Sequence, residues 1–360
     1  MVDFRSALYL GMHHPHAALP AWEQLSLGMP AALEPPPGMV PLARSLAELT
    51  GCEAAMAVTS SLHLFWDLFA VLAHEPIAIY RESSLYPTAL WGVERVAVRG
   101  IKLRVFGQHH LAELAAWLHR DRGLGVKPVI VADGLLPSSG KAAPLSAYLD
   151  LARGRGGYVV IDDTQALGIL GHNPCHSNPY GLGGGGTAVW HGAGGPELIL
   201  ASSLAKGFGV PLAMLAGSRA IVEQFAALAS TQVHCSPPSV AVINAARLAL
   251  TQNARQGDPL RRRLLLNVRE FQRCLNRIGL VATSGVFPMQ TLQPMLGLDM
   301  VRLHDCLWRL GIKSVLHGTH GAKEPRISFL LTAAHVQADI QEVEWALRKA
   351  LPLAARRYAA

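Results

Sequence analysis

The chain has 360 residues, half of them hydrophobic and only 16% charged, which excludes a largely disordered protein and leaves room for a large and a small domain. The formal charge is +7, but the arginines are scattered apart from the run Arg261-Arg262-Arg263. No basic tract carries interleaved aromatic residues, so we expect no nucleic-acid partner. The positive charge either favours small anions such as phosphates, carboxylates or coenzyme A esters, or serves solubility alone.

Residues 1–40 predict an irregular arm rich in histidine and proline, which in an oligomer can wrap a neighbouring subunit. The spacing of Leu42, Leu46 and Leu49 then predicts an amphipathic helix that ends at Gly51. Up to residue 201, strand patterns alternate with helix patterns, which predicts a mainly parallel sheet covered by helices. The expected strands are 54–58, 77–80, 104–106, 129–132, 159–162 and 198–201, and the expected helices are 62–72, 88–95, 111–119 and 146–153.

After Gly217 the pattern changes to long helical stretches, followed by a mixture of short strands and helices. This change predicts a second, smaller α+β domain at the C-terminal end of the chain. The expected helices are 220–229, 239–253, 258–278, 301–310 and 338–351, with a strand at 326–331. We therefore expect an arm over residues 1–40, a large domain over 41–235 and a small domain over 236–360.

The cysteine pattern and the first residues indicate the cellular compartment. Five cysteines are widely spaced and form no C-x-x-C pair, which is typical of a reducing compartment. The N-terminus carries Asp3 and no apolar signal-peptide core, and no apolar stretch reaches the ~18 residues of a membrane span. We expect a cytoplasmic protein without a membrane span. The cluster at 172–176 has no second cluster at zinc spacing, so no metal site is expected.

The strongest chemical signal is a lysine that follows an acid by about forty residues. A short β-branched run ends in Asp162, which predicts a buried parallel strand whose carboxylate emerges at the carboxyl end. Lys206 stands among small residues and glycines, after the apolar run 198–200, which predicts an amine on a tight loop. An aldehyde cofactor with a pyridine ring needs both groups, an amine for the aldehyde and a carboxylate for the ring nitrogen. Taken singly, the lysine is more typical of a solvated surface residue and the acid of a metal or ribose site.

A glycine-dense segment over 180–195 contains the pattern G-x-G-x-x-G at Gly181, Gly183 and Gly186. A dinucleotide fingerprint must follow a strand and open a helix. The sequence around this segment indicates neither element, so we expect a loop without nucleotide.

At this point the chain resembles a fold-type-I pyridoxal-phosphate enzyme of the α-oxoamine synthase group, which includes 8-amino-7-oxononanoate synthase, glycine C-acetyltransferase and serine palmitoyltransferase. The resemblance extends over nearly the whole chain. Tyr9-Leu10-Gly11-Met12 is similar to the group's Asn-Tyr-Leu-Gly-Leu, and residues 203–209 are similar to its Thr-x-x-Lys-x-x-Gly. Gly134, Gly140 and Ala143-Pro144-Leu145 resemble its Glu-Gly, Asp-Gly and Ala-Pro-Leu, and Arg326-Ile327-Ser328 with Thr332-Ala333-Ala334-His335 resembles its C-terminal strand.

The resemblance implies pyridoxal 5′-phosphate as the cofactor and assigns its contacts. Lys206 would form the Schiff base and move the substrate proton, and Asp162 would pair with the ring nitrogen. The phosphate would be bound by Ser203 and by the hydroxyl and N–H groups that open the helix at Ser60, Ser61 and Leu62. For each of these serines, ordinary helix capping is an equally good interpretation.

Two further positions carry implied cofactor contacts. Tyr86 stands where the group places the aromatic residue, usually histidine, that stacks on the cofactor ring; an ordinary core tyrosine is the alternative. Ser236, or His234 beside it, stands where the group lends a hydroxyl to the phosphate of the neighbouring subunit. A homodimer with shared sites is therefore expected.

Two positions depart from the group's pattern. Gln165 replaces the histidine of Asp-x-x-His, which normally donates to the phenolic oxygen of the cofactor; glutamine can donate a hydrogen bond but cannot carry a proton. Ser328 replaces the second arginine of Arg-x-Arg, which grips the amino-acid carboxylate. Arg326 remains and shares a strand face with Ser328, so we expect it to bind the substrate carboxylate, with a surface ion pair as the alternative.

The function implied by the resemblance is that of a PLP-dependent acyltransferase, which condenses an amino acid with an acyl-CoA or acyl-carrier-protein thioester. An aminotransferase, aldolase or decarboxylase with different substrate anchoring would use the same lysine and aspartate. A cofactor-binding subunit without turnover is a third hypothesis, which the intact Lys206 and Asp162 disfavour. The sequence names neither the amino acid nor the acyl donor.

Overall fold

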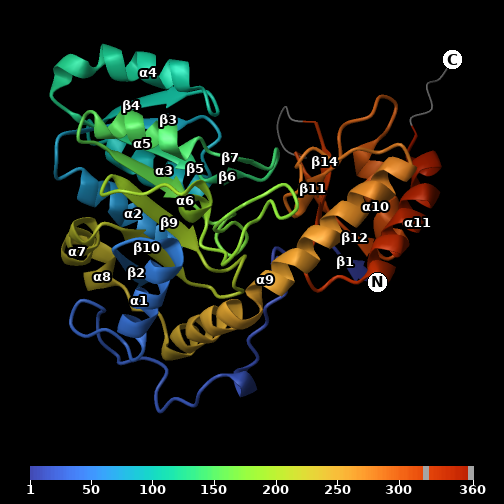
Figure 1. Ribbon diagram of the computed structural model, residues 1–360, viewed down its shortest axis with the longest axis horizontal. Coiled ribbons are helices and arrows are strands. Elements are labelled where there is room, and N and C mark those ends of the chain that lie inside the picture. Colours follow the sequence, from blue (N-terminus) through green and yellow to red (C-terminus); the bar gives the residue numbers. More distant parts are fainter. Residues whose placement is uncertain (319–323, 356–360) are drawn as a thin grey trace. The chain divides into compact units, whose positions relative to one another are not determined.

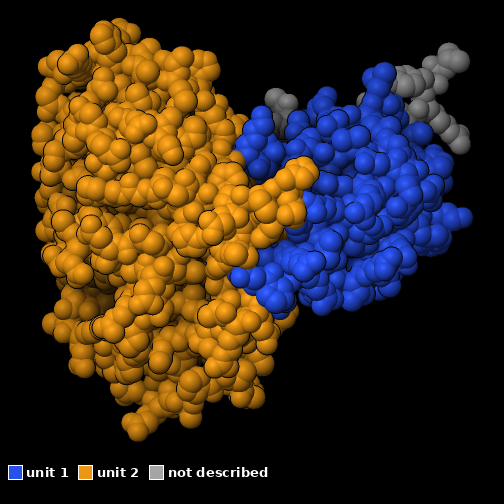
Figure 2. Space-filling view, in the orientation of Figure 1, with its two compact units in different colours: residues 1–11, 136–141, 258–360 blue, residues 12–135, 142–257 orange. Residues whose placement is uncertain are grey.

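The computed structural model describes residues 1–318 and 324–355, and the chain divides into two compact units, which Figure 2 distinguishes by colour. Unit 1 consists of residues 1–11, 136–141 and 258–360, and unit 2 of residues 12–135 and 142–257. The expected arm is therefore shared between the units, and the division after residue 257 lies beyond the expected boundary at 235/236. The domain boundaries expected from the sequence remain predictions.

Unit 2 is built on a seven-stranded sheet in the order β2-β10-β9-β8-β5-β3-β4 (Figure 1). Strand β10 runs antiparallel to both of its neighbours, and the other adjacent pairs are parallel. The mainly parallel sheet expected from the sequence is thus confirmed. Its strands are β2 (Ala54–Val58), β3 (Ile77–Glu82), β4 (Lys102–Phe106), β5 (Lys127–Asp133), β8 (Tyr158–Asp162), β9 (Leu198–Ser203) and β10 (Ala213–Gly217).

Helices cover both faces of this sheet, because consecutive residues of each buried strand point to opposite faces. On β3, Ile77 and Ile79 join one hydrophobic cluster while Ala78 and Tyr80 join the other. The first cluster includes residues of α2, α3 and α7, and the second includes residues of α4 and α5. The helices of unit 2 are α1 (Met39–Thr50), α2 (Ser61–Leu72), α3 (Pro87–Ala97), α4 (Leu111–Arg120), α5 (Leu145–Arg153), α6 (Thr187–His191), α7 (Arg219–Leu228) and α8 (Ser230–His234), with 3-10 turns η1 (His16–Ala18) and η2 (Arg122–Leu124).

Unit 1 contains a three-stranded antiparallel sheet in the order β11-β14-β13 and a parallel pair of β1 with β12. The strands are β1 (Val2–Asp3), β11 (Met289–Thr291), β12 (Ile312–Lys313), β13 (Val315–His317) and β14 (Arg326–Leu330), and the helices are α10 (Met300–Arg309) and α11 (Gln337–Ala354). The hairpin strands β6 (Leu135–Leu136) and β7 (Lys141–Ala142) stand where the chain passes from one unit to the other. The expected small α+β architecture is confirmed.

The two helices expected at 239–253 and 258–278 form one helix, α9 (Val240–Arg277), with Pro259 inside it. The sequence Gly257-Asp258-Pro259 predicts a break, because proline lacks the N–H that an interior helical position uses. The loss of one hydrogen bond does not end this helix. Among the described residues, no helix is long and apolar enough to cross a membrane.

Candidate functional site

Most of the residues predicted for a cofactor site lie along one edge of the unit 2 sheet. Asp162, the last residue of β8, stands between Asp133 of β5 and Ala201 of β9 in the strand register. Ser203 ends β9, and Ala213 of β10 pairs with both Ser203 and Val58, the last residue of β2. Strands are spaced by about 4.8 Å, so the end of β2 and Ser203 lie about 10 Å apart at the same edge. Ligands of parallel α/β sheets bind at this edge, outside the carboxyl ends of the strands.

Lys206 stands on a tight turn that begins directly after β9. The turn packs closely against the loop after β8, since a Cβ added to Gly168 would lie 2.9 Å from Gly207 Cα. On the turn itself, His14 Nε2 donates to Phe208 O at 2.7 Å. These contacts fix the backbone that carries the lysine, so that its amine is presented from an ordered loop.

The amine of Lys206 lies in a half-buried position, with its Nζ 5.7 Å from the centre of the Tyr86 ring. Burial lowers the pKa of Lys206, while the carboxyls of Asp162 and Asp133 partly oppose that shift. A lower pKa leaves more of the amine unprotonated near neutral pH, as a nucleophile requires. The surroundings therefore suit an amine that reacts with a carbonyl.

Two carboxyls share this environment, of which sequence reasoning identified only one. Asp162 is 7% exposed and accepts a hydrogen bond from Thr164 N at 3.1 Å, and burial raises its pKa. Asp133 accepts from Tyr86 N at 3.2 Å, and burial together with the neighbouring Asp162 raises its pKa to about 8. The sequence signal for Asp133 was the same as for Asp162, an acid that ends an apolar strand.

Asp163, next to Asp162, binds the start of a helix instead of facing the lysine. It is fully buried and accepts from Thr187 N at 2.9 Å and from Thr187 Oγ1 at 2.6 Å, at the start of α6. The glycine-dense segment expected to be only a loop thus opens a short helix at Gly186, and that expectation was wrong. The acceptor at the helix start is the carboxyl of Asp163 itself, and a Cβ at Gly186 would lie 1.9 Å from its Oδ2.

The residues predicted to bind phosphate lie at the start of α2, directly after β2. Ser60 caps this helix, since its Oγ accepts from His63 N at 3.3 Å, so the capping interpretation holds for this serine. In the part of the chain that the structure describes, the N–H groups of Ser61 and Leu62 have no recorded acceptor, which leaves them available to an anion. Ser236 lies beside them, because its carbonyl oxygen accepts from Thr59 Oγ1 at 3.1 Å.

The remaining predicted cofactor contacts belong to the same unit. Ser203 N donates to Thr164 Oγ1 at 3.0 Å, which ties the end of β9 to the loop after β8. Tyr86 caps α3 and is 52% exposed, so it is not an ordinary core tyrosine. Gln165 is half-buried on the loop after Asp162. The roles of these three residues toward a cofactor remain predictions.

Arg326, predicted to bind a substrate carboxylate, belongs to unit 1. It is exposed, and with Thr291 and His317 it lines a cavity of about 580 Å³. Ser328, which replaces the second arginine, is fully buried.

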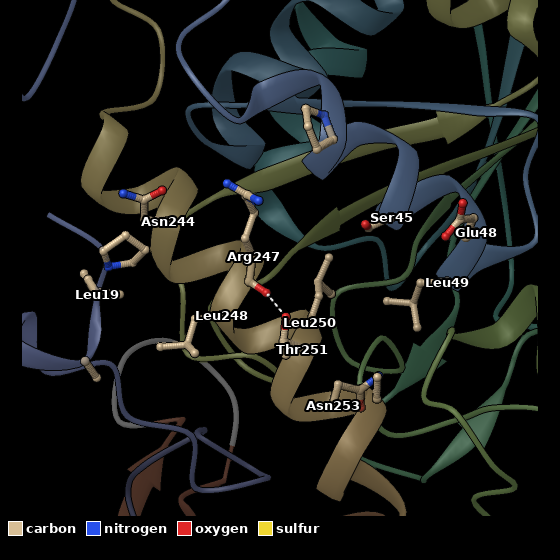
Figure 3. Close-up of a pocket in the computed structure, with 14 residues that line it drawn as sticks. Leu19, Ser45, Glu48, Leu49, Asn244, Arg247, Leu248, Leu250, Thr251 and Asn253 are labelled. Atoms are coloured by element: carbon tan, nitrogen blue, oxygen red, sulfur yellow. Dashed lines mark hydrogen bonds between the residues drawn. The ribbon is translucent and has the colours of Figure 1, made fainter. Parts of the chain in front are cut away.

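A larger cavity of about 960 Å³ lies elsewhere in unit 2, among residues 18–20, α1 and α9 (Figure 3). Its polar lining includes Glu48, Asn244 and Arg247. Among its described lining residues there is no lysine and none of the residues predicted for the cofactor. Its size does not make it the candidate site, because the lysine and the paired acids lie at the sheet edge.

The buried acids predict that the cofactor-free protein loses stability as the pH rises. Burial raises the pKa of Asp163 to about 7 and that of Asp133 to about 8. The folded protein therefore keeps protons that the unfolded chain releases near pH 4, and the free energy of unfolding falls between about pH 4 and pH 8. We expect a higher melting temperature at pH 5 than at pH 8, and a smaller difference in the variant Asp133→Asn. If Asp133→Asn showed the same difference in melting temperature between pH 5 and pH 8 as the wild type, the attribution to Asp133 would be contradicted.

Comparison with known proteins gives a consistent set of matches. A family model described as aminotransferase class I and II matches residues 96–343. The 8-amino-7-oxononanoate synthase of Pseudomonas putida (strain GB-1) is 26% identical over 313 residues, which cover 86% of this chain and 75% of that protein. Two solved structures share the fold. A lysine-to-alanine variant of serine palmitoyltransferase from S. paucimobilis, with a bound PLP–myriocin aldimine, has a TM-score of 0.83 at 16% identity, and the match covers 98% of this chain and 88% of that chain. The 8-amino-7-oxononanoate synthase from Francisella tularensis has a TM-score of 0.73 at 18% identity, with 98% of each chain covered.

Proposed function

The chain belongs to the aminotransferase class I and II family, and on that basis we propose that it is a PLP-dependent acyltransferase that condenses an amino acid with an acyl thioester. The relatives named 8-amino-7-oxononanoate synthase and the serine palmitoyltransferase fold confirm the resemblance to the α-oxoamine synthase group predicted from the sequence. The observation that carries the proposal is the half-buried Lys206 amine at the carboxyl edge of the sheet, whose Nζ lies 5.7 Å from the centre of the Tyr86 ring and whose pKa is lowered by burial.

The residues at this edge fit pyridoxal phosphate by their chemistry. When bound, the cofactor supplies an aldehyde for the lysine and a ring that accepts electrons from the substrate. Lys206 Nζ would hold the cofactor and later carry a proton to or from the α-carbon of the substrate. The Asp162 carboxylate would keep the ring nitrogen of the cofactor protonated. The positive charge on that nitrogen would in turn compensate for the burial of the carboxylate.

The other residues would orient and anchor the cofactor. The N–H groups of Ser61 and Leu62, with the hydroxyl of Ser203, would bind the phosphate. The exposed face of Tyr86 would cover the ring, and Gln165 would donate to the phenolic oxygen without carrying a proton. Water exclusion around Lys206 would strengthen each of these polar contacts.

We further propose that the protein works in the cytoplasm as a homodimer with a biosynthetic role. Exposed Ser236 would reach the phosphate of the neighbouring subunit. Its position beside Thr59 supports a place at the phosphate end of a site. Arg326 would bind the carboxylate of the amino acid, and the thioester would be carried by coenzyme A or an acyl carrier protein.

A second candidate function is an aminotransferase, aldolase or decarboxylase. Ser328 favours it, because it replaces the arginine with which the α-oxoamine synthase group binds the amino-acid carboxylate, and Gln165 departs from the same group at a cofactor contact. These reactions would use the same lysine and aspartate, so only the products distinguish them.

The test combines the PLP-loaded protein with glycine, L-alanine or L-serine and with acyl-CoA esters of different chain length. We expect free thiol to be released only when both the matching amino acid and a thioester are present, which a thiol reagent measures. Formation of an oxo acid from the amino acid with 2-oxoglutarate, without thiol release, would contradict the acyltransferase and support the second candidate.

A further inference from the structure

One face of the three-stranded sheet in unit 1 gathers polar side chains from three separate segments. In the register, Thr291 of β11 pairs with Ser328 of β14, and His317 of β13 pairs with Arg326. Residues two apart on a strand share a face, so Arg326 and Ser328 point to the same side, together with their partners Thr291 and His317.

Hydrogen bonds link three of these side chains into a relay. Thr291 Oγ1 lies 2.7 Å from Ser328 Oγ, and Ser328 Oγ lies 2.5 Å from His317 Nε2. Ser328 is fully buried and Thr291 is 3% exposed, whereas His317 is half-buried. The two buried hydroxyls are therefore hydrogen-bonded to each other and to the ring nitrogen of His317. The imidazole is the member of the relay that can still bind a ligand through its other nitrogen.

The relay borders the cavity of about 580 Å³, which His317, Thr291 and Arg326 line together with Ser138, Met289, Gly318 and Glu324. Arg326 makes no ion pair with any described residue, so its guanidinium remains available to a ligand. Of the described residues that line the cavity, Glu324 is the one acid, and it is exposed, which leaves its charge screened by water.

We propose that this cavity binds a carboxylate through the Arg326 guanidinium and the His317 imidazole, and that Ser328 is the positioning residue that orients the imidazole. With Thr291 donating to Ser328 and Ser328 donating to His317 Nε2, the ring proton stands on Nδ1 and can be donated to a carboxylate oxygen. On the proposed function the ligand is the amino-acid substrate. Arg326 and His317 would then take over the carboxylate from the second arginine of the group's pattern, which Ser328 replaces.

The charge state of the histidine agrees with this arrangement. Burial and the neighbouring Arg326 lower the pKa of His317, so the ring is neutral at pH 7 in the absence of a ligand. The charged groups around the ring that line the cavity are Arg326 and Glu324. A bound carboxylate adds a negative charge and raises the pKa of the ring again.

The test follows the imidazole nitrogen signals of His317 by NMR in the full-length protein, assigned by their absence in His317→Gln. Propionate is added at constant ionic strength, with propionamide as the uncharged probe of the same shape. We expect a saturable shift with propionate alone. The apparent Kd should rise about 10- to 100-fold in Arg326→Gln and about 5- to 10-fold in Ser328→Ala. Arg302→Gln, which removes an exposed arginine of the same unit, is the matched control and should respond as the wild type does.

The absence of a saturable shift in the wild type would overturn the proposal, and so would an equal response in Arg326→Gln. Because Arg326 is exposed, that variant is expected to fold even where Ser328→Ala does not. The carboxylate site depends on the proposed function only for the identity of its ligand, so the binding of PLP is measured on the same samples. If the protein binds PLP but the His317 signals do not shift with propionate, only the carboxylate site is contradicted. If the His317 signals shift but the protein does not bind PLP, only the proposed function is contradicted.

Discussion

Lys206→Ala is expected to abolish the retention of PLP through dialysis and to lower amino-acid-dependent activity by at least ~10³-fold. The amine is half-buried, and burial lowers its pKa, which favours the reactive, unprotonated form at some cost to stability. No other lysine lies on the turn after β9. The visible absorption of the dialysed protein measures the loss, together with the mass gained after reductive trapping of the cofactor.

Lys349→Ala provides the matched control, since this lysine is exposed on α11. It should keep both the absorption and the added mass of the wild type. Replacing Lys206 removes the cost of burying its amine, so the melting temperature of the cofactor-free variant should not fall. If Lys206→Ala retained turnover, the assignment of Lys206 as the residue that binds PLP would be refuted.

The sheet was predictable where its strands are made of β-branched and aliphatic residues. The strand Ala54–Val58 was expected with the bounds that the structure shows, and the strand ending at Asp162 differs by one residue. Strand β10 (Ala213–Gly217) was not expected, because Ala-Met-Leu-Ala-Gly has no β-branched residue and no alternation. It is a strand because β2 and β9 pair with it on both sides, a long-range effect that no local pattern contains.

The position of the candidate site was predictable where one residue type at one spacing indicates a specific chemistry. Lys206 and Asp162 were predicted in this way, and their roles toward a cofactor remain predictions. Asp133 carried the same local signal, yet its importance depends on its place beside Asp162 in the register, which the sequence does not give. The relay through Ser328 was likewise out of reach, because His317 and Ser328 come from different strands, and the serine alone looked like the loss of an arginine.

Asp162→Asn is the second large effect that we expect, with activity lowered on the order of 10²- to 10³-fold and PLP bound more weakly. Asparagine fits the space but lacks the negative charge that would keep the ring nitrogen protonated. Asp163→Asn is the informative comparison, because Asp163 binds Thr187 at the start of α6 and is fully buried. It should lower the melting temperature while the absorption of bound PLP stays that of the wild type.

The two adjacent acids thus separate function from stability. Burial raises the pKa of Asp162, so without cofactor its ionised form destabilises the fold at pH 8, and Asp162→Asn removes that cost. The cofactor-free variant should therefore melt no lower than the wild type at pH 8, although it has lost most of its activity. An aspartate whose replacement leaves the fold as stable but removes the activity is kept for its chemistry, whereas the replacement of Asp163 costs the hydrogen bonds to Thr187. A lower melting temperature for Asp162→Asn, with activity intact, would assign the structural role to Asp162 and reopen the choice between the two.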